Sequence, residues 1–409
     1  MKFTEARDIA LNKGELCDHC LGRLVSLAFK GNAVEQVGAA LRVSKKDSDI
    51  PKNLKKKLKI QEKKCSLCGG LFAKNKKVMA LVLKRMKEQE FETFLMGCKL
   101  PEGVQEHEEF VWTLVGTDNA EPIKREINRT LGKALEKKSK KRVDFDNPDV
   151  IFTVDYEEDS VGVQINSLFI YGKYRKLIRG IPQTKWPCRE CHGRGCKRCG
   201  GTGKMYQETV EELVAEKAIK ETHAVASKFH GKGREDIDAL MLGDGRPFVL
   251  ELVAPKKRIV DLKKLEKKIN AFTKGKVEIS GFRLSSMNEV RELKSAESEK
   301  VYECIVECKG VTKADVDLIN KTFINAHLLQ RTPTRVAHRR SDLVRKKVIK
   351  SVKAVLIDKA HFKAVIEASS GTYIKELVSG DNSRTKPSFT ELLGKPCACV
   401  ELNVVEVRE

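Results

Sequence analysis

Four pairs of cysteines in this chain are each separated by two residues, a spacing that suits metal binding. Two such pairs can present four thiolates to one tetrahedral zinc ion, and an all-thiolate set leaves no coordination position open for catalysis. The glycines around the last two pairs, in CRECHGRGCKRCGGTG, permit the tight turns that this geometry needs. We therefore predict two structural zinc centres, formed by Cys17, Cys20, Cys65 and Cys68, and by Cys188, Cys191, Cys196 and Cys199.

Two other interpretations of these cysteines remain open. The pairs could be redox-active, or the two quartets could exchange ligands, but no thioredoxin-like βαβ pattern surrounds either quartet. His19 and His192 lie within the motifs and could act as ligands, although four thiolates already complete each site. The remaining cysteines are predicted to be buried small side chains: Cys98, Cys304, Cys308, Cys397 and Cys399.

A loop rich in acids is the strongest candidate for catalysis. HGKGREDIDALMLGDGRPFVLELV carries Arg234, Glu235, Asp236 and Asp238 immediately before an apolar strand. A rigid sheet can aim charged groups placed on such a loop. A polar hairpin with a surface ion pair worth less than about 1 kcal/mol is an equally weighted alternative. Neither G-x-G-x-x-G nor the P-loop pattern occurs here, so the glycines do not indicate nucleotide binding.

Basic and aromatic residues elsewhere suggest contacts with a polyanion. The segment Arg331–Arg340 has many cations and no acid, an arrangement that a polyanion would stabilise. Tyr373 stands beside Lys375 after a glycine turn, where an aromatic face could stack on a base. Tyr302 lies on one face of a predicted strand. The basic segment 44–64 is either a solvated helix or a phosphate-facing surface.

Composition agrees with a nucleic-acid partner. The chain has 409 residues and a net charge of +22, with a pI near 9.4. Such an excess favours nucleic acid over other partners. No apolar span of membrane length and no signal-peptide core is found, so we expect a cytoplasmic protein without membrane contact. We also expect a monomer.

The elements that must position these residues divide the chain into four parts. We predict a zinc-binding segment at 1–75, an α+β module at 76–185, a zinc knuckle at 186–204 and a large catalytic domain at 205–409. Within the module, residues 78–86 and 108–116 are expected to be strands and residues 123–138 a helix. Residues 149–174 are expected to form two strands, and Thr209 should cap a helix that follows the knuckle.

Several of these segments together resemble one enzyme family. GREDIDA followed by LGDGRPFVLEL looks like the active-site segment of RNA pseudouridine synthases. LCDHCLGRL, CSLC, SLFIYGKYRKLIRGIPQTKWPC, QRTPTRVAHRR and GTYIKEL match, in order, the archaeal and eukaryotic "Pus ten" type of tRNA pseudouridine synthase. The resemblance extends over essentially the whole chain. It implies an α+β architecture, with a zinc-binding and THUMP-type RNA-binding region preceding a mixed-sheet pseudouridine synthase domain.

The resemblance also implies roles for individual residues. Asp236 would be the essential aspartate, with Asp238 as its nearest competitor. Arg234 would hold the displaced nucleotide or pair with the aspartate, and Tyr302 and Tyr373 would line the uracil pocket. Lys375 and the segment Arg331–Arg340 would contact the substrate. An arginine is common in this family at the position of Leu240, which puts one RNA contact in doubt.

The activity implied is isomerisation of uridine to pseudouridine at positions 54 and 55 in the TΨC arm of tRNA. It needs a carboxylate but no catalytic cofactor, and zinc would be structural. Two alternatives remain. The chain could be another THUMP-containing tRNA-modifying enzyme, such as a thiolase or methyltransferase, or a zinc-dependent tRNA-binding protein without catalysis.

Overall fold

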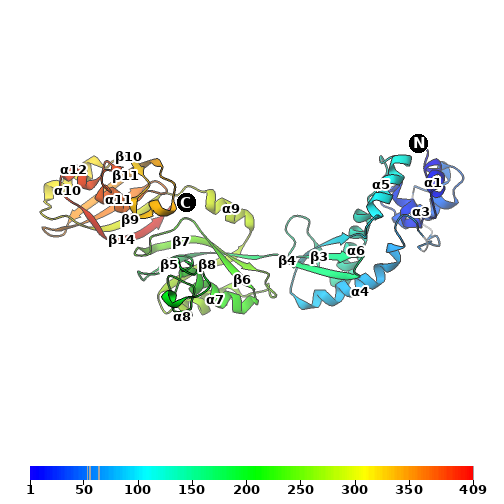
Figure 1. Ribbon diagram of the computed structural model, residues 1–409, viewed down its shortest axis with the longest axis horizontal. Helices are drawn as coiled ribbons and strands as arrows, with labels where there is room; N and C mark the ends of the chain where they lie inside the picture. Colours follow the sequence, from blue (N-terminus) through cyan, green and yellow to red (C-terminus); the bar gives the residue numbers. More distant parts are fainter. Residues whose placement is uncertain (53, 55–56, 63–64, 409) are drawn as a thin grey trace. The chain divides into compact units, whose positions relative to one another are not determined.

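The computed structural model describes residues 1–52, 54, 57–62 and 65–408, which form two compact units (Figure 1). Unit 1 contains Met1–Ser167 and Ala254–Ile259, and unit 2 contains Leu168–Val253 and Val260–Glu409. Part of the basic segment 44–64, predicted to be either a solvated helix or a phosphate-facing surface, lies outside the described residues.

Unit 1 is built on a four-stranded sheet in the order β2-β1-β3-β4. β1 runs parallel to β2 and β3, and β3 pairs with β4 in the antiparallel sense. Alternate residues of β3 are buried, as expected for a strand with one covered face. The strands are β1 (Thr93–Lys99), β2 (Arg142–Val143), β3 (Val150–Asp155) and β4 (Ser160–Ile165).

Helices complete unit 1, and α6 packs against β1 while α4 packs against β4. At the amino-terminal end α2 and α3 cross so closely that glycine is required at the crossing. A Cβ on Gly22 would lie 1.9 Å from the carbonyl oxygen of Val34, and one on Gly38 would lie 1.7 Å from that of Asp18. The helices are α1 (Phe3–Leu11), α2 (Asp18–Arg23), α3 (Val34–Val43), α4 (Asn75–Arg85), α5 (Val104–Val115) and α6 (Ile123–Ser139).

Two predicted strands of this unit are wrong. Residues 78–86 lie mostly in α4, and residues 108–116 lie mostly in α5. In α4 the buried residues Val78, Met79 and Val82 recur at helical spacing, and this amphipathic face packs on the sheet. The helix predicted at 123–138 is confirmed as α6. Of the two strands expected over 149–174, the first is β3, but the second is divided into β4 and a further strand, β5 (Leu168–Lys176), which belongs to the large sheet of unit 2.

Unit 2 contains a ten-stranded mixed sheet. Its order is β13-β10-β11-β12-β9-β14-β7-β5-β8, with β6 also paired to β7, and β14 is parallel to β7. The strands are β5 (Leu168–Lys176), β6 (Ala226–Gly231), β7 (Leu240–Val253), β8 (Val277–Ser285), β9 (Lys300–Glu307), β10 (Ala326–Arg331), β11 (Val344–Leu356), β12 (His361–Ala368), β13 (Thr385–Lys386) and β14 (Ala398–Val407).

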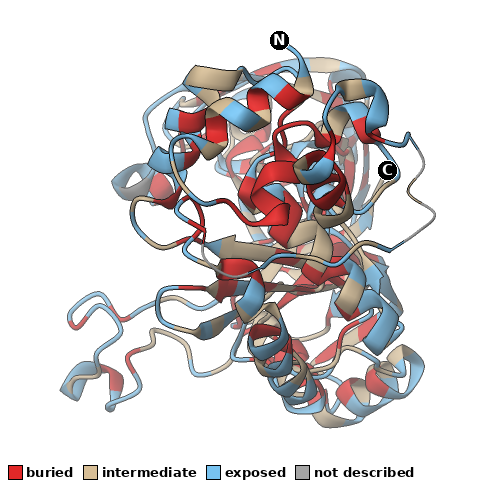
Figure 2. Ribbon diagram, turned by 90° about the vertical axis from the view of Figure 1, so that its right-hand side faces the viewer, coloured by how far each residue is buried: buried red, intermediate tan, exposed pale blue. Residues whose placement is uncertain are grey.

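Helices pack on this sheet and bury apolar residues against it. Figure 2 shows helices whose turns carry buried residues on one side and exposed residues on the other. Thr209 caps α7 by accepting a hydrogen bond from the backbone N–H of Glu212, as predicted. The helices are α7 (Val210–Thr222), α8 (Leu262–Thr273), α9 (Met287–Ser295), α10 (Lys313–Thr322), α11 (Ile374–Ser379) and α12 (Phe389–Leu393). Short 3-10 helices occur at η1 (Ser26–Phe29), η2 (Asp47–Asp49), η3 (Leu71–Lys74), η4 (Met86–Glu88), η5 (Lys197–Cys199) and η6 (Thr334–Arg339).

The start of unit 2 differs from the predicted division of the chain. We placed residues 76–185 in one module, whereas β5 pairs with β7 and β8 of the large sheet. The zinc knuckle expected at 186–204 follows β5 and therefore lies within unit 2 rather than between two domains. The α+β class and the mixed sheet agree with the prediction.

Candidate functional site

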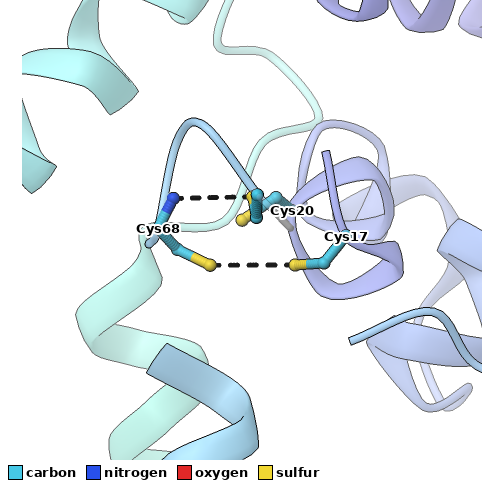
Figure 3. Close-up of side chains that lie close together, drawn as sticks. Cys17, Cys20 and Cys68 are labelled. Carbon is cyan, nitrogen blue, oxygen red and sulfur yellow. Dashed lines mark hydrogen bonds between the residues drawn. The ribbon is translucent and has the colours of Figure 1, made fainter. Parts of the chain in front are cut away.

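The first cysteine quartet lies in unit 1, with all four side chains buried. Cys17 precedes α2 and Cys20 lies in its first turn, while Cys65 and Cys68 lie on a turn ahead of η3. The sulfurs of Cys17 and Cys68 point toward each other and are 3.8 Å apart (Figure 3). The backbone N–H of Cys68 donates to the sulfur of Cys65 over 3.5 Å.

A buried charge network surrounds this quartet. The guanidinium of Arg23 donates to the sulfur of Cys20 over 3.3 Å and pairs with Glu108 and Glu126. Because a zinc ion with four thiolates carries net negative charge, a buried guanidinium beside it is favourable. Nδ1 of His19 lies 2.6 Å from a carboxylate oxygen of Glu126, so His19 has a partner outside the four-cysteine set.

The second quartet lies in unit 2, between β5 and α7. Its sulfurs are 3.8 Å apart for Cys188 and Cys196, 3.8 Å for Cys191 and Cys199, and 3.7 Å for Cys196 and Cys199. Backbone N–H groups of Gly195, Cys196 and Gly203 each donate to a sulfur over 3.2 Å. Such bonds stabilise thiolates in a tight knuckle.

Both quartets have dimensions that fit zinc. Within each one, the four sulfurs lie within 4.8 Å of one another. A Zn–S distance of about 2.3 Å in a tetrahedron places sulfurs about 3.8 Å apart, which matches the separations given above. The sequence predicted which four cysteines belong to each quartet, and in both cases the structure brings those four side chains together.

A pocket of about 260 Å³ in unit 2 brings together most of the predicted catalytic and substrate-binding residues. Arg234 and Asp236 reach it from the loop before β7, Tyr302 from β9, and Tyr373 from the start of α11. Arg246, Lys300, Arg335, Leu402 and Val404 complete much of the wall. The pocket is thus a mixed surface of cations, aromatic rings and aliphatic side chains.

Arg335, which lies in η6, holds the carboxylate of Asp236. Its two terminal nitrogens each lie 3.1 Å from an oxygen of Asp236, and its Nε donates to the buried carboxylate of Glu376 over 2.7 Å. Burial opposes the charged form of Arg335, but the ion pairs with Glu376 and Asp236 outweigh it and raise the pKa of Arg335. This two-point contact fixes the orientation of the Asp236 carboxylate.

Asp238 lies in a different environment from Asp236. It does not line the 260 Å³ pocket, and its side chain is 64% exposed. Lys375 donates a hydrogen bond to Asp238, and the Lys375 nitrogen is 4.0 Å from Asp236. Partial burial acts to raise the pKa of Asp238, but the Lys375 ammonium lowers it overall.

Glu235, between Arg234 and Asp236, points away from solvent and anchors the loop. Its carboxylate accepts hydrogen bonds from the hydroxyl of Tyr174 over 2.8 Å and from Nε of Arg246 over 2.9 Å. The ammonium of Lys176 lies 3.8 Å from the other carboxylate oxygen. Lys176 also donates to the backbone carbonyls of Asp236 and Ile237, each over 3.1 Å, so buried charges hold the backbone beneath Asp236.

The tyrosines and Lys300 define the remaining chemistry of the pocket. Burial raises the pKa of Tyr302 to about 12, so its hydroxyl stays protonated at neutral pH. Burial and the nearby charge of Arg246 lower the pKa of Lys300 to about 8. The hydroxyl of Tyr373 accepts a hydrogen bond from Arg340 over 2.9 Å.

Comparison with known proteins identifies the chain. The family model described as "Pus10, C-terminal" matches residues 169–408, and the one described as "Pus10 THUMP domain, archaeal" matches residues 79–155. The chain belongs to the Pus10 family. Proteins named tRNA pseudouridine synthase Pus10 are 42% identical over 404 residues in Methanothermobacter marburgensis and 40% over 408 residues in Pyrococcus furiosus. These alignments cover 98% and 100% of this chain, and 96% and 98% of the relatives.

The two Pus10 family matches correspond to the two structural units. The THUMP match falls in unit 1, where it includes β1, β2 and β3 and helices α5 and α6, and the C-terminal match begins within β5 of unit 2. The Pus10 protein of Methanocaldococcus jannaschii is 38% identical over 430 residues, covering 98% of this chain and 93% of that protein. Across the described ranges, no helix has both the length and the apolar character needed to cross a membrane.

Sequence reasoning missed several residues of this Pus10 site. It placed Arg335 within a substrate-contacting segment, whereas the structure pairs Arg335 with Asp236 and Glu376. It also overlooked Lys176 and Arg246, whose charges lie at buried positions of strands β5 and β7. A charged residue at an otherwise apolar position of a strand was the available signal, because burying an unpaired charge is costly.

Proposed function

We propose that this Pus10 chain is a tRNA pseudouridine synthase that isomerises uridine at positions 54 and 55 in the TΨC arm, with Asp236 as the essential residue and no catalytic cofactor. One observation carries the proposal: the Asp236 carboxylate lies at a pocket of about 260 Å³, held in a two-point contact by Arg335. This volume is slightly below the roughly 300 Å³ at which drug-sized ligand pockets begin. It suits a single nucleobase turned out of the RNA.

The reaction accounts for the groups around Asp236. Isomerisation breaks the bond between N1 of uracil and C1′ of ribose, turns the base and forms a bond between C5 and C1′. C5 loses its proton in the last step, and N1, which carries a hydrogen in the product, takes up a proton, so the numbers of protons lost and gained are equal. A fixed carboxylate can serve either as nucleophile or as base in this sequence.

The wall of the pocket provides the remaining requirements. Tyr302, largely buried and protonated, offers an aromatic face beside Asp236, and Leu402 and Val404 exclude water. Tyr373 adds a second ring that Arg340 holds by its hydroxyl. Arg234 and Lys375 supply positive charge next to the catalytic loop, where a nucleotide phosphate would need it.

Binding energy must offset the cost of extracting the uridine from its stack, a few kcal/mol. The net charge of +22 supports strong, salt-dependent contact with the tRNA phosphates. We expect a monomer to suffice, because every residue assigned to the pocket belongs to unit 2 of one chain. Zinc at the two quartets would be structural, at about two ions per chain.

The decisive assay measures tritium release from C5-labelled tRNA together with carbodiimide mapping of the product. Asp236→Asn and Asp236→Ala should abolish pseudouridine at both positions while retaining tRNA binding. Asp238→Asn is the comparison variant, since Asp238 lies two residues away and does not line the 260 Å³ pocket, and at saturating tRNA it should retain catalysis. Full activity of Asp236→Ala would refute the assignment, and loss only with Asp238→Asn would transfer the role to Asp238.

A further inference from the structure

A second pocket, of about 140 Å³, also borders the loop that carries Asp236. The loop residues Arg234, Glu235 and Asp236 line both pockets, as does Arg335. The wall facing the loop is formed by residues that lead into the zinc knuckle: Pro182, Gln183 and Trp186. A group bound here would therefore be a direct neighbour of a group bound in the larger pocket.

Trp186 gives this pocket an aromatic surface that is held in place. Its ring contacts Tyr206 edge to face, with centroids 5.6 Å apart and planes at 87°. The carbonyl of Trp186 accepts a hydrogen bond from the backbone N–H of Met205 over 2.9 Å, and Pro187 pairs with Lys204 across the base of the knuckle. The two sides of the knuckle thus fix the indole next to the catalytic loop.

The charges around the pocket favour a nucleotide. The guanidinium carbon of Arg234 lies 5.9 Å from the Trp186 ring centroid. The nearby carboxylates are engaged by other cations, Asp236 by Arg335 and Asp238 by Lys375. An aromatic face beside a guanidinium is the usual surface on which proteins bind an unpaired base of RNA.

The chemistry of base extraction supplies a reason for such a surface. When a uridine leaves its stack, the base beside it loses a stacking partner. A ring placed one nucleotide from the Asp236 carboxylate can replace that partner and hold the gap open. The purely structural alternative is that Trp186 only stabilises the knuckle through Tyr206.

We propose that the 140 Å³ pocket binds the nucleobase adjacent to the target uridine, with Trp186 as its stacking surface and Arg234 contacting the same nucleotide. The proposal rests on the proposed function, because it takes Asp236 as the point at which the target uridine is bound. It gives the second zinc knuckle a role in the reaction, since the knuckle positions Trp186.

Fluorescence can test the stacking directly, because the chain has only two tryptophans. In a Trp112→Phe background, Trp186 is the only indole, and saturating tRNA should quench its emission strongly. The same titration with Asp236→Asn added separates binding from catalysis. Quenching with no pseudouridine formation in the parent protein would refute the proposed function and leave the stacking intact. Unchanged emission at saturating tRNA, with normal catalysis, would overturn the stacking proposal alone.

A cycle between protein and RNA variants supplies the second test. Trp186→Ala should weaken tRNA binding by about 5- to 150-fold, the range for one stacked base, and Trp186→Phe should restore most of it. An abasic site next to the target uridine should weaken binding to the wild type by a similar factor and have little further effect on Trp186→Ala. The stacking contact would be refuted if the loss of affinity from Trp186→Ala simply multiplied the loss from an abasic site, whichever side of the target uridine carries that site. Metal content of each variant verifies that the knuckle still holds its zinc.

Discussion

Replacing Lys176 by methionine tests how the loop beneath Asp236 is held. Methionine has nearly the volume of the lysine stem but removes the buried ammonium. The change deletes hydrogen bonds of 3.0 Å to the Ile181 carbonyl and 3.1 Å to the carbonyls of Asp236 and Ile237. It also leaves Glu235 without the cation 3.8 Å from its carboxylate.

The expected magnitude follows from two opposing effects. Removing one partner of a buried ion pair costs about 3–5 kcal/mol, and the three carbonyls would lose their donor. Against this, burial lowers the pKa of Lys176, so the folded protein already bears a penalty for its charge, which methionine removes. We therefore expect the free energy of unfolding of unit 2 to fall by about 3 kcal/mol, the lower end of that range.

The assay uses urea unfolding of the Trp112→Phe protein, followed by far-UV circular dichroism and by Trp186 emission, which reports on unit 2. Lys173→Met, on the same strand, is the matched control and should alter the free energy by no more than about 0.5 kcal/mol. Turnover should also fall for Lys176→Met, because the backbone of Asp236 loses its donor. An unfolding free energy within about 1 kcal/mol of the parent value and unchanged turnover would refute this account of the loop.

Three further predictions concern the pocket and the knuckle. Arg335→Gln should lower the single-turnover rate of tritium release about 100-fold with little change in tRNA affinity, since misorientation of a reacting group costs about this much. Glu376→Gln should lower the same rate by a smaller factor, because Glu376 acts on Asp236 only through Arg335. Lys300, whose pKa is lowered by burial to about 8 against 10.5 unfolded, loses its proton first in the folded state. Stability should therefore rise by up to about 3 kcal/mol between pH 8 and pH 10.5, and urea titrations of Lys300→Met should lack this rise. Cys188→Ser should remove one of two zinc ions by metal analysis and lower the unfolding temperature, while a zinc content unchanged from wild type would exclude that ligand set.

The sequence predicted best those features that depend on short spacing. Each cysteine quartet consists of two C-x-x-C turns, and each turn determines where its two sulfurs lie. The cap at Thr209 and helix α6 are local in the same sense. The strand predicted at residues 78–86 was wrong because a short apolar run is compatible with either a strand or a helix until its packing partner is known.

The proposed catalytic constellation could be predicted only in part, because its contacts join residues far apart in the sequence. Arg335 meets Asp236 across 99 residues, and this contact depends on the paths of β10 and α11 on the large sheet. No spacing rule in the sequence predicts that meeting. The buried cations Lys176 and Arg246 were hidden for a related reason, since their partner Glu235 looks like one of several acids on a polar loop.

The three acids of GREDID differ in environment, and this difference argues for Asp236 as the reacting group. Glu235 is fully buried and hydrogen-bonded to Tyr174 and Arg246, so it cannot reach a substrate without breaking the anchor of the loop. Asp238 faces solvent and is neutralised by Lys375. Glu235 and Asp236 both line the larger pocket, but the Glu235 side chain is buried, whereas that of Asp236 is 33% exposed. A carboxylate that reacts with C1′ or removes a C5 proton must be held at a defined distance from that atom. The buried Glu235 anchors the loop next to Asp236, and Arg335 aligns the two carboxylate oxygens of Asp236, so both requirements are met there.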